Sequence, residues 1–385
     1  MIPYGKHLID EDDIASVISV LRSDFLTQGE MVPQFERAVC ARVGARHGVA
    51  VNSATSALHV ACLALNLSPG DIFWTSSISF VASANCGLYC GATVDFVDID
   101  PKTFNISVDL LERKLIIAEA LGKLPKLLIV VHMAGLSCDM VSIRALGDRY
   151  GFSIIEDASH ALGGRYLNLP IGSCQYSDIT IFSFHPVKII TSGEGGMAVT
   201  NNDLLAREMQ LLRSHGITRD PTEMVEKSRQ PVCYEQITLG FNYRMTDIHA
   251  AIGLSQLNKL DSFVTRRNDI ANIYLNRFAA LPLSTQRRDT ESYSAYHLFI
   301  IQPYYRDGSR SRDLMLQHLL SKGIICNIHY RPIMAHPYFN SMGFDVNDYP
   351  NALHYYQTSL SIPIFPGMAE EEITLCIDSV TDFLV

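Results

Sequence analysis

The chain has 385 residues, of which 48% are apolar and 18% are charged. That length exceeds one typical domain, so we expect a large domain and a smaller one. The net charge of −9 excludes a general nucleic-acid-binding protein, which needs a basic surface. It does not exclude a local site for an anionic ligand.

The sequence gives no sign of export or of membrane insertion. The opening MIPYGKHLIDEDD becomes acidic and lacks the apolar run of a signal peptide, and no stretch approaches the ~20 apolar residues of a membrane helix. The nine cysteines are dispersed, without zinc-site spacing, and Cys86 and Cys90 would share one helix face. We therefore expect reduced thiols, no metal site, no membrane partner and a cytoplasmic location.

Helices are predicted over residues 10–23 and 32–43, from apolar residues at helical spacing. Short apolar runs then alternate with helices. The strands are expected at 49–51, 72–74, 92–100, 126–135, 152–159, 178–184 and 196–200, and the helices at 55–65, 80–89 and 139–150. This alternation indicates a mostly parallel sheet covered on both faces. Because such sheets bind ligands at the carboxyl ends of their strands, the residues after each strand are the candidates.

The alternation of short strands and helices ends near Thr246, where a long helical stretch begins. A strand at 295–302, a helix at 313–321 and a terminal helix from 369 follow it. We expect a large domain over 1–245 and a connecting helix with a small α/β domain over 246–385, with the N-terminal segment packing on the small domain. The polar stretch 219–236 is predicted to be a long surface loop.

A lysine follows the predicted strand 178–184, in the turn FSFHPVKIITSGEGG. Taken alone, Lys188 is explained as an exposed surface side chain. In a loop at a sheet edge, however, partial burial would lower its pKa and make the amine nucleophilic. The glycines that follow it would let a ligand approach the backbone closely.

Two further features follow strands of the same predicted sheet. Asp157 ends the apolar strand IIED, where a carboxylate acts either as the N-cap of the next segment or as a site residue. The segment VNSATSALH at 51–59 begins a helix with small and hydroxyl residues. Its free N–H groups form an anion site, or Ser53 and Thr55 simply cap the helix.

Together these features match the requirements of pyridoxal 5′-phosphate (PLP). PLP needs a lysine for its aldehyde, a carboxylate that keeps its pyridine nitrogen protonated, and a phosphate site. Lys188, Asp157 and the helix start at 53–55 would supply them. Phe80, just after the strand near 72–76, would stack on the ring of the cofactor.

With these motifs, the chain resembles the DegT-type nucleotide-sugar aminotransferases, which are PLP enzymes. The resemblance covers almost the whole chain, in LTQGEMVPQFE (26–36), VAVNSATSALH (49–59), ISFVASAN (78–85), VDFVDIDPKTFNI (94–106), EDASHALGGRY (156–166), FSFHPVKIITSGEGG (182–196), LGFNYRMTDIHAAIGLSQL (239–257) and HYRP (329–332). It implies the α/β aspartate-aminotransferase fold (fold type I). That fold has a large domain with a mostly parallel mixed sheet and a smaller C-terminal α/β domain.

The resemblance assigns roles to individual residues. Lys188 matches the lysine that forms the Schiff base with PLP, Asp157 the partner of the pyridine nitrogen, and His160 the residue near the ring hydroxyl. These three are the implied catalytic residues. The phosphate would be bound by small and hydroxyl residues, namely Ala54, Thr55 and Ser183.

The resemblance also implies a partner chain. Asn242 matches the asparagine that contacts the phosphate across the dimer interface, so a homodimer with shared active sites is expected. The motifs do not fix the residues that read the substrate. Candidates are Tyr4, Lys6, Arg244, His329 and Arg331, each of which is also explained as a solvated side chain or a turn residue.

Within the family, IPYGKHLIDEDDI, NSATSALH and HYRPI most resemble the transaminases of pseudaminic acid synthesis. This implies transfer of the amino group of L-glutamate to the C4 keto group of a UDP-linked 2-acetamido-2,6-dideoxy-hexos-4-ulose. The alternatives are another keto sugar nucleotide, with dTDP or GDP and amination at C3 or C4, and a PLP-binding regulatory protein. A dehydratase branch has histidine in place of the lysine, and Lys188 argues against it.

Overall fold

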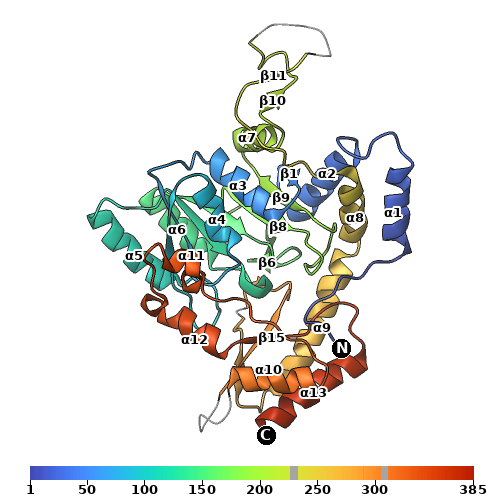
Figure 1. Ribbon diagram of the computed structural model, residues 1–385, viewed down its shortest axis with the longest axis vertical. Helices are drawn as coiled ribbons and strands as arrows, with labels where there is room; N and C mark the ends of the chain where they lie inside the picture. The colour runs from blue at the N-terminus through green and yellow to red at the C-terminus, as the bar shows by residue number, and fades with distance from the viewer. Residues whose placement is uncertain (226–232, 289, 305–310) are drawn as a thin grey trace.

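The computed structural model describes residues 1–225, 233–288, 290–304 and 311–385. A seven-stranded sheet forms its centre (Figure 1). In spatial order its strands are β1 (His47–Val51), β9 (Gly196–Thr200), β8 (Ile179–Ser183), β5 (Ser153–Asp157), β4 (Leu127–Val131), β2 (Ile72–Ser76) and β3 (Thr93–Val97). Strand β9 is antiparallel to both its neighbours, and the pairs from β8 to β3 are parallel. The predicted mixed, mostly parallel sheet is confirmed.

Helices cover both faces of this sheet. Successive side chains of a strand point to opposite faces, so neighbouring residues of one strand pack against different helices. Ile129 and Ile155 pack with α3, α4 and α7, whereas Val130 and Ile154 pack with α5 and α6. Helices α2 and α8 cover the second face beside β9. The helices of this part are α1 (Glu11–Leu21), α2 (Met31–Val43), α3 (Ala54–Ala64), α4 (Ala82–Tyr89), α5 (Val108–Ala120), α6 (Met140–Tyr150), α7 (Asp203–Arg213) and α8 (Asp247–Leu257).

A smaller antiparallel sheet lies in the lower part of Figure 1 and packs against α9, α10 and α13. The elements are β12 (Leu283–Thr285), β14 (Phe299–Pro303), β15 (Leu360–Ile362), α9 (Leu260–Phe278), α10 (Arg312–Ser321) and α13 (Glu370–Leu384). The N-terminus joins this part, since Ile2 N donates to Gly323 O and Ile325 N donates to Ile2 O, both at 2.8 Å. Helix α8 packs against the large sheet, in the same apolar cluster as α2 and β9. The expected boundary at 245 counts it with the connecting helix of residues 246–385.

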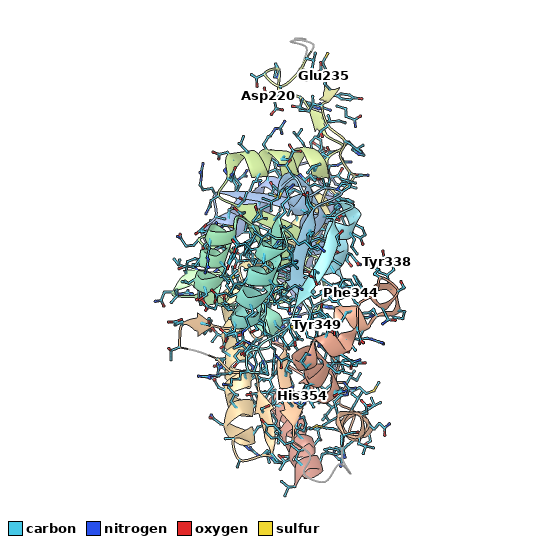
Figure 2. All side chains as sticks on the ribbon, turned by 90° about the vertical axis from the view of Figure 1, so that its left-hand side faces the viewer. Asp220, Glu235, Tyr338, Phe344, Tyr349 and His354 are labelled. Carbon is cyan, nitrogen blue, oxygen red and sulfur yellow. The ribbon has the colours of Figure 1, made fainter. Side chains whose placement is uncertain are left out.

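The segment between α10 and β15 returns to the edge of the large sheet. Phe344 and Tyr349 pack edge-on against Phe96 of β3, with ring centroids 5.0 and 6.2 Å away (Figure 2). This segment contains η2 (Ile333–Ala335), α11 (Pro337–Asn340), η3 (Val346–Asp348) and α12 (Pro350–Thr358). It therefore connects the large sheet to the smaller one.

An arm projects from the large sheet at the top of Figure 1, formed by β10 (Ile217–Thr218) and β11 (Glu235–Gln236). Asp220 and Glu235 mark it in Figure 2. The predicted loop 219–236 falls on this arm, and its residues 226–232 lie outside the described part of the chain. Where the structure describes it, the stretch is a paired arm rather than a plain loop, because β10 and β11 exchange backbone hydrogen bonds.

A third, minor sheet joins β6 (Arg165–Tyr166), β7 (Leu169–Pro170) and β13 (Ser292–Tyr293). Leu167 and Asn168 connect β6 to β7 with φ angles of 48° and 65°. A two-residue hairpin turn with both φ angles positive favours glycine or asparagine. Leu167 therefore occupies a strained backbone position.

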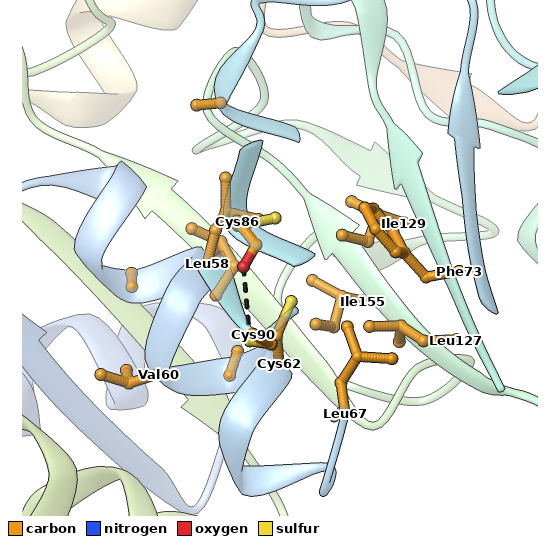
Figure 3. Packing of buried hydrophobic residues seen from close by; sticks show 14 of the residues in the cluster. Leu58, Val60, Cys62, Leu67, Phe73, Cys86, Cys90, Leu127, Ile129 and Ile155 are labelled. Carbon is orange, nitrogen blue, oxygen red and sulfur yellow. Dashed lines mark hydrogen bonds between the residues drawn. The ribbon is translucent and has the colours of Figure 1, made fainter. Parts of the chain in front are cut away.

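Three cysteines lie in the core under α3 and α4. Cys62, Cys86 and Cys90 are buried among Leu58, Phe73 and other apolar side chains (Figure 3). Cys86 and Cys90 share one face of α4, as expected, and the Cys90 thiol donates to the Cys86 carbonyl oxygen at 3.4 Å. Among the described residues, no helix has the length and apolar character needed to cross a membrane.

The contact between α4 and β2 allows a test of this packing. A Cβ on Gly87 would lie 2.4 Å from the ring of Phe73, so Gly87→Ala should lower the free energy of unfolding by about 1–3 kcal/mol. The opposite sign would follow from helix propensity alone, which favours alanine by about 1 kcal/mol. Urea unfolding measures the change, and Phe73→Leu should recover part of it in the double variant. Gly147→Ala is the control, because its nearest atom is the flexible end of Ile154 at 3.0 Å.

Candidate active site

A cavity of about 420 Å³ opens at the edge of the large sheet. It lies where β1, β2, β5 and β8 end, because these strands point to the same edge. Nine of the residues expected from the sequence line it: Tyr4, Ala54, Thr55, Phe80, Asp157, His160, Ser183, Lys188 and His329. The site predicted from separate motifs is thus one cavity in the folded chain.

Lys188 lies in the turn after β8, where its backbone N–H donates to His185 O at 2.9 Å. Burial lowers the pKa of the Lys188 amine to about 8, and the charge of Asp157 acts in the opposite direction. A sizeable fraction of the amine is therefore neutral near neutral pH. The neutral amine is the form that attacks an aldehyde.

Asp157 is the last residue of β5 and is 6% exposed. Its Oδ2 accepts a hydrogen bond from Ser83 Oγ at 2.8 Å, and its Oδ1 accepts one from Ser159 N at 3.2 Å. Ser83 Oγ is in turn 2.7 Å from Ser79 Oγ. Each carboxylate oxygen has two acceptor positions, so Asp157 is held in place and still has capacity for a protonated ring nitrogen.

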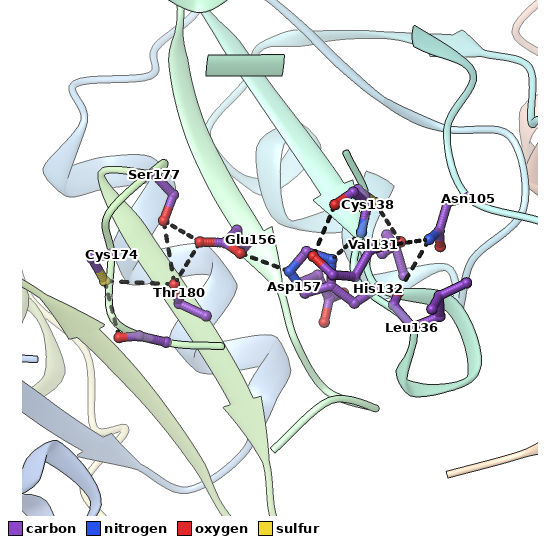
Figure 4. A network of polar contacts seen from close by, with 12 residues as sticks. Asn105, Val131, His132, Leu136, Cys138, Glu156, Asp157, Cys174, Ser177 and Thr180 are labelled. Carbon is purple, nitrogen blue, oxygen red and sulfur yellow. Dashed lines mark hydrogen bonds and ion pairs between the residues drawn. The ribbon is translucent and has the colours of Figure 1, made fainter. Parts of the chain in front are cut away.

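A buried polar network behind Asp157 joins the ends of β4 and β5 (Figure 4). His132 Nε2 lies 2.7 Å from Glu156 Oε2, and the backbone N–H of Cys138 donates to His132 Nδ1 at 3.1 Å. Since Nδ1 accepts, Nε2 carries the proton that is donated to Glu156. Glu156 also accepts from two hydroxyl groups, those of Ser177 and Thr180. His132 N donates to Asp157 O at 3.2 Å, so this network fixes the strand end that carries Asp157.

The helix start after β1 has the geometry of an anion site. Ser53 caps α3, since its side chain accepts from Ser56 N at 3.1 Å. The N–H groups of Ala54 and Thr55 belong to the first turn, where no intrahelical acceptor exists. Strand β9 passes very close, because a Cβ on Gly196 would lie 2.4 Å from Ala54 N. Ser183 ends β8 and lines the same cavity as Ala54 and Thr55, so one cavity holds the kinds of donor that phosphate binding requires.

His160 lies after β5 and is 4% exposed. Its Nε2 is 3.0 Å from the Tyr330 hydroxyl, and its Nδ1 is buried with no hydrogen-bond partner among the described residues. Burial, and then the charge of Lys188, hold the pKa of His160 well below its usual value. The ring is therefore neutral, and its Nδ1 is enclosed by the protein rather than open to the cavity.

Phe80 contributes an aromatic wall. It lines the cavity although 58% of the residue is exposed, and its ring centroid is 6.2 Å from that of Tyr330. An exposed ring beside a cavity is suited to stacking on a planar ligand. A lysine of lowered pKa, a fixed carboxylate, an anion site, an unsatisfied imidazole and this ring together fit PLP.

Four expected residues lie outside this cavity. Lys6, Asn242 and Arg331 are exposed and do not line its described wall. Arg244 lines a second cavity of about 310 Å³ and donates to Ser214 Oγ at 3.1 Å. A single chain therefore does not bring these four to Lys188, and their predicted roles are not tested by it.

Other residues line the cavity without having been singled out from the sequence. Tyr330 lies in the HYRP segment and Glu194 in FSFHPVKIITSGEGG, both of which gave a signal, but Asn327 lies in no such segment. A charged or polar side chain in a loop normally indicates only solvent exposure. Their positions depend on how distant loops meet.

Comparison with known proteins identifies the family. A model of the DegT/DnrJ/EryC1/StrS aminotransferase family matches residues 7–381. The spore coat polysaccharide biosynthesis protein SpsC of Bacillus subtilis is 36% identical over 386 residues, which cover 100% of this chain and 97% of that protein.

Solved structures agree with this match. Helicobacter pylori PseC, an aminotransferase involved in the biosynthesis of pseudoaminic acid, superimposes with a TM-score of 0.89 at 30% identity over 100% of this chain and 99% of that chain. The putative sugar aminotransferase Spr1654 from Streptococcus pneumoniae, in its PMP form, gives 0.89 at 29% identity over 100% of both chains, and it is also known in a PLP form. The chain therefore belongs to the DegT/DnrJ/EryC1/StrS family and is a PLP-dependent sugar aminotransferase of fold type I.

Proposed function

We propose that the enzyme transfers the amino group of L-glutamate to the C4 keto group of a UDP-linked 2-acetamido-2,6-dideoxy-hexos-4-ulose, a step of pseudaminic acid biosynthesis. The observation that carries the transaminase site is Lys188, whose amine lines the same cavity as Asp157 and has a pKa of about 8. The similarity to PseC over the whole chain supports the choice of acceptor. We also propose a cytoplasmic location.

The proposed roles follow the geometry of the cavity. When bound, PLP supplies an aldehyde and an electron-withdrawing ring. Lys188 would hold the cofactor through its aldehyde, and its amine would take up and return the proton that moves during transfer. Asp157 keeps the ring nitrogen protonated, and His160 donates to the ring hydroxyl. Phe80 stacks on the ring.

The phosphate site is proposed to involve two copies of the chain. Ala54, Thr55 and Ser183 bind the phosphate from one copy, and Asn242 reaches it from the other. Asn242 is exposed on its own chain, as a residue that acts across an interface must be before assembly. The proposed large domain is 1–245, and 246–385 holds the connecting helix and the small domain.

The sugar nucleotide is proposed to enter beside Tyr4 and His329. These rings lie 4.9 Å apart and line the cavity, so they are placed to contact the sugar. Lys6, Arg244 and Arg331 are the proposed partners of the diphosphate, because cationic side chains bind phosphate oxygens.

A second candidate substrate is a keto sugar nucleotide of another surface polysaccharide. The similarity to SpsC favours it, since that relative is named for spore coat polysaccharide biosynthesis and is 36% identical. The nucleotide would then be dTDP or GDP, with amination at C3 or C4. The regulatory protein considered from the sequence is set aside, because the chain belongs to a family of aminotransferases.

An assay with L-glutamate and a panel of 3-keto and 4-keto UDP-, dTDP- and GDP-sugars tests the acceptor. We expect amination of the UDP-4-keto sugar with release of 2-oxoglutarate. Reaction with dTDP-sugars alone would refute the UDP assignment. Lys188→Ala should lose the yellow colour of the bound cofactor, and its rate should fall by at least about 10²–10⁴-fold. Lys322 is exposed, so Lys322→Ala should keep both the colour and the rate. Amination of none of these sugars by PLP-loaded wild-type protein would refute the proposed acceptor.

The ionisation of Lys188 gives an independent test in cofactor-free protein. Because the amine is protonated below its pKa of about 8, its reaction with a small aldehyde should rise with pH and level off above that value. Asp157→Asn removes the charge that raises this pKa, so the midpoint should move to lower pH. Borohydride trapping followed by peptide mass spectrometry measures the rate at Lys188. Asp148→Asn, on the exposed side of α6, should leave the midpoint unchanged, and a midpoint near the usual value for lysine would contradict the burial of this amine.

A further inference from the structure

His297 lies directly behind His160, in the segment that leads into β14. It is 4% exposed, and its ring centroid is 4.4 Å from that of His160 with an angle of 44° between the planes. The residues described around the cavity wall include His160 but not His297. His297 therefore lies next to a residue of the cavity wall without lining the cavity itself.

The backbone of His297 is held from two sides. Arg267 of α9 is 1% exposed, and its Nη1 donates to the carbonyl oxygens of Tyr296 at 3.2 Å and His297 at 3.3 Å. On the other side, a Cβ on Gly135 would lie 2.9 Å from His160 O and 3.2 Å from His297 N. Only glycine permits this approach, at a φ of 99°. The His297 ring thus rests on a fixed backbone.

The His297 ring is also neutral. Burial is the main cause that holds its pKa well below the usual value for histidine, followed by unfavourable electrostatic interaction of a protonated ring with His160, Lys188, Arg267 and His329. A second cation next to Lys188 would be unfavourable in a buried site. The Nδ1 of His297 is buried without a partner among the described residues, so this atom forms no hydrogen bond that orients the ring. Its contact with His160 is one of packing.

We propose that His297 is a positioning residue for His160: its ring packs against the His160 imidazole and holds that imidazole at the cavity wall, with Nε2 beside the Tyr330 hydroxyl. The inference rests on the role proposed above for His160. Among the described residues His160 has one side-chain hydrogen bond, 3.0 Å from Tyr330, so hydrogen bonding alone does not fix the orientation of its ring. The His297 ring fixes this orientation by occupying the space behind it.

His297→Ala would empty that space and let His160 move. The hydrogen bond to the ring hydroxyl would weaken, and PLP should bind about two- to tenfold more weakly. A donor to the hydroxyl oxygen makes the adjacent lysine–cofactor nitrogen less basic. Its loss should therefore raise the pH at which the bound cofactor changes colour by about 0.5–1 unit. His297→Phe should restore both properties, because it keeps a planar ring and removes no hydrogen bond at Nδ1.

The experiment measures PLP affinity by fluorescence and titrates the absorption of the bound cofactor with pH, for wild type, His297→Ala and His297→Phe. Thermal unfolding of the cofactor-free proteins is recorded in parallel. His318→Ala is the control, since His318 contacts Ser379 O between α10 and α13, away from the cavity. It should lower the melting temperature and leave the affinity and the colour transition unchanged. Should His297→Ala not fold, His297→Asn is measured in its place.

A shifted colour transition and weaker binding in the alanine variant, both restored by phenylalanine, would support the proposal. If the alanine variant only loses thermal stability, as His318→Ala does, His297 is structural and the proposal is wrong. The proposal is equally wrong if the phenylalanine variant behaves like the alanine variant. Wild-type protein that takes up no PLP would instead refute the proposed site as a whole.

Discussion

The parallel alignment of β2, β4, β5 and β8 is the constraint on which the rest of this structure depends. It brings the loops after these strands to one edge of the sheet, and the antiparallel β9 turns the chain so that β1 ends there too. Asp157 and Lys188 come from neighbouring strands, β5 and β8, although about 30 positions separate them in the chain, and they share a cavity for this reason.

Burial of charge governs the chemistry at this edge. Among the described residues that line the cavity, Lys188 is the one lysine, and there is no arginine. Its lowered pKa makes the neutral amine available. The same burial, together with the charge of Lys188, lowers the pKa of His160 and of His329. Rings that stay neutral accept or donate hydrogen bonds without adding charge. The histidines thus offer hydrogen bonds to the cavity without adding cations to it, which suits a cofactor that carries its own phosphate and ring charge.

Much of the architecture is predictable from the sequence. All seven strands of the large sheet are predicted, because fully buried strands are short apolar runs with clear boundaries. Helices α5, α7 and α12 are not predicted; the apolar patterns of α5 and α12 are weak, whereas α7 is clearly amphipathic and was missed. The minor strands β6, β7 and β13 are two residues long and leave no periodic pattern to detect. The arm formed by β10 and β11 is predicted as a loop for the same reason.

The sequence by itself determined the chemical groups of the candidate site. Short motifs contain Lys188, Asp157 and the helix start at Ala54 and Thr55, and the local structure of each motif depends on its own turn and capping residues. Only the tertiary structure decided which distant residues surround them: Tyr330 beside His160, Ser83 on Asp157, and His297 behind His160 held by Arg267. These contacts join segments far apart in the chain. Packing between helices, strands and loops produces these contacts, and neither the spacing nor the periodicity of residues in the sequence shows which elements will pack together.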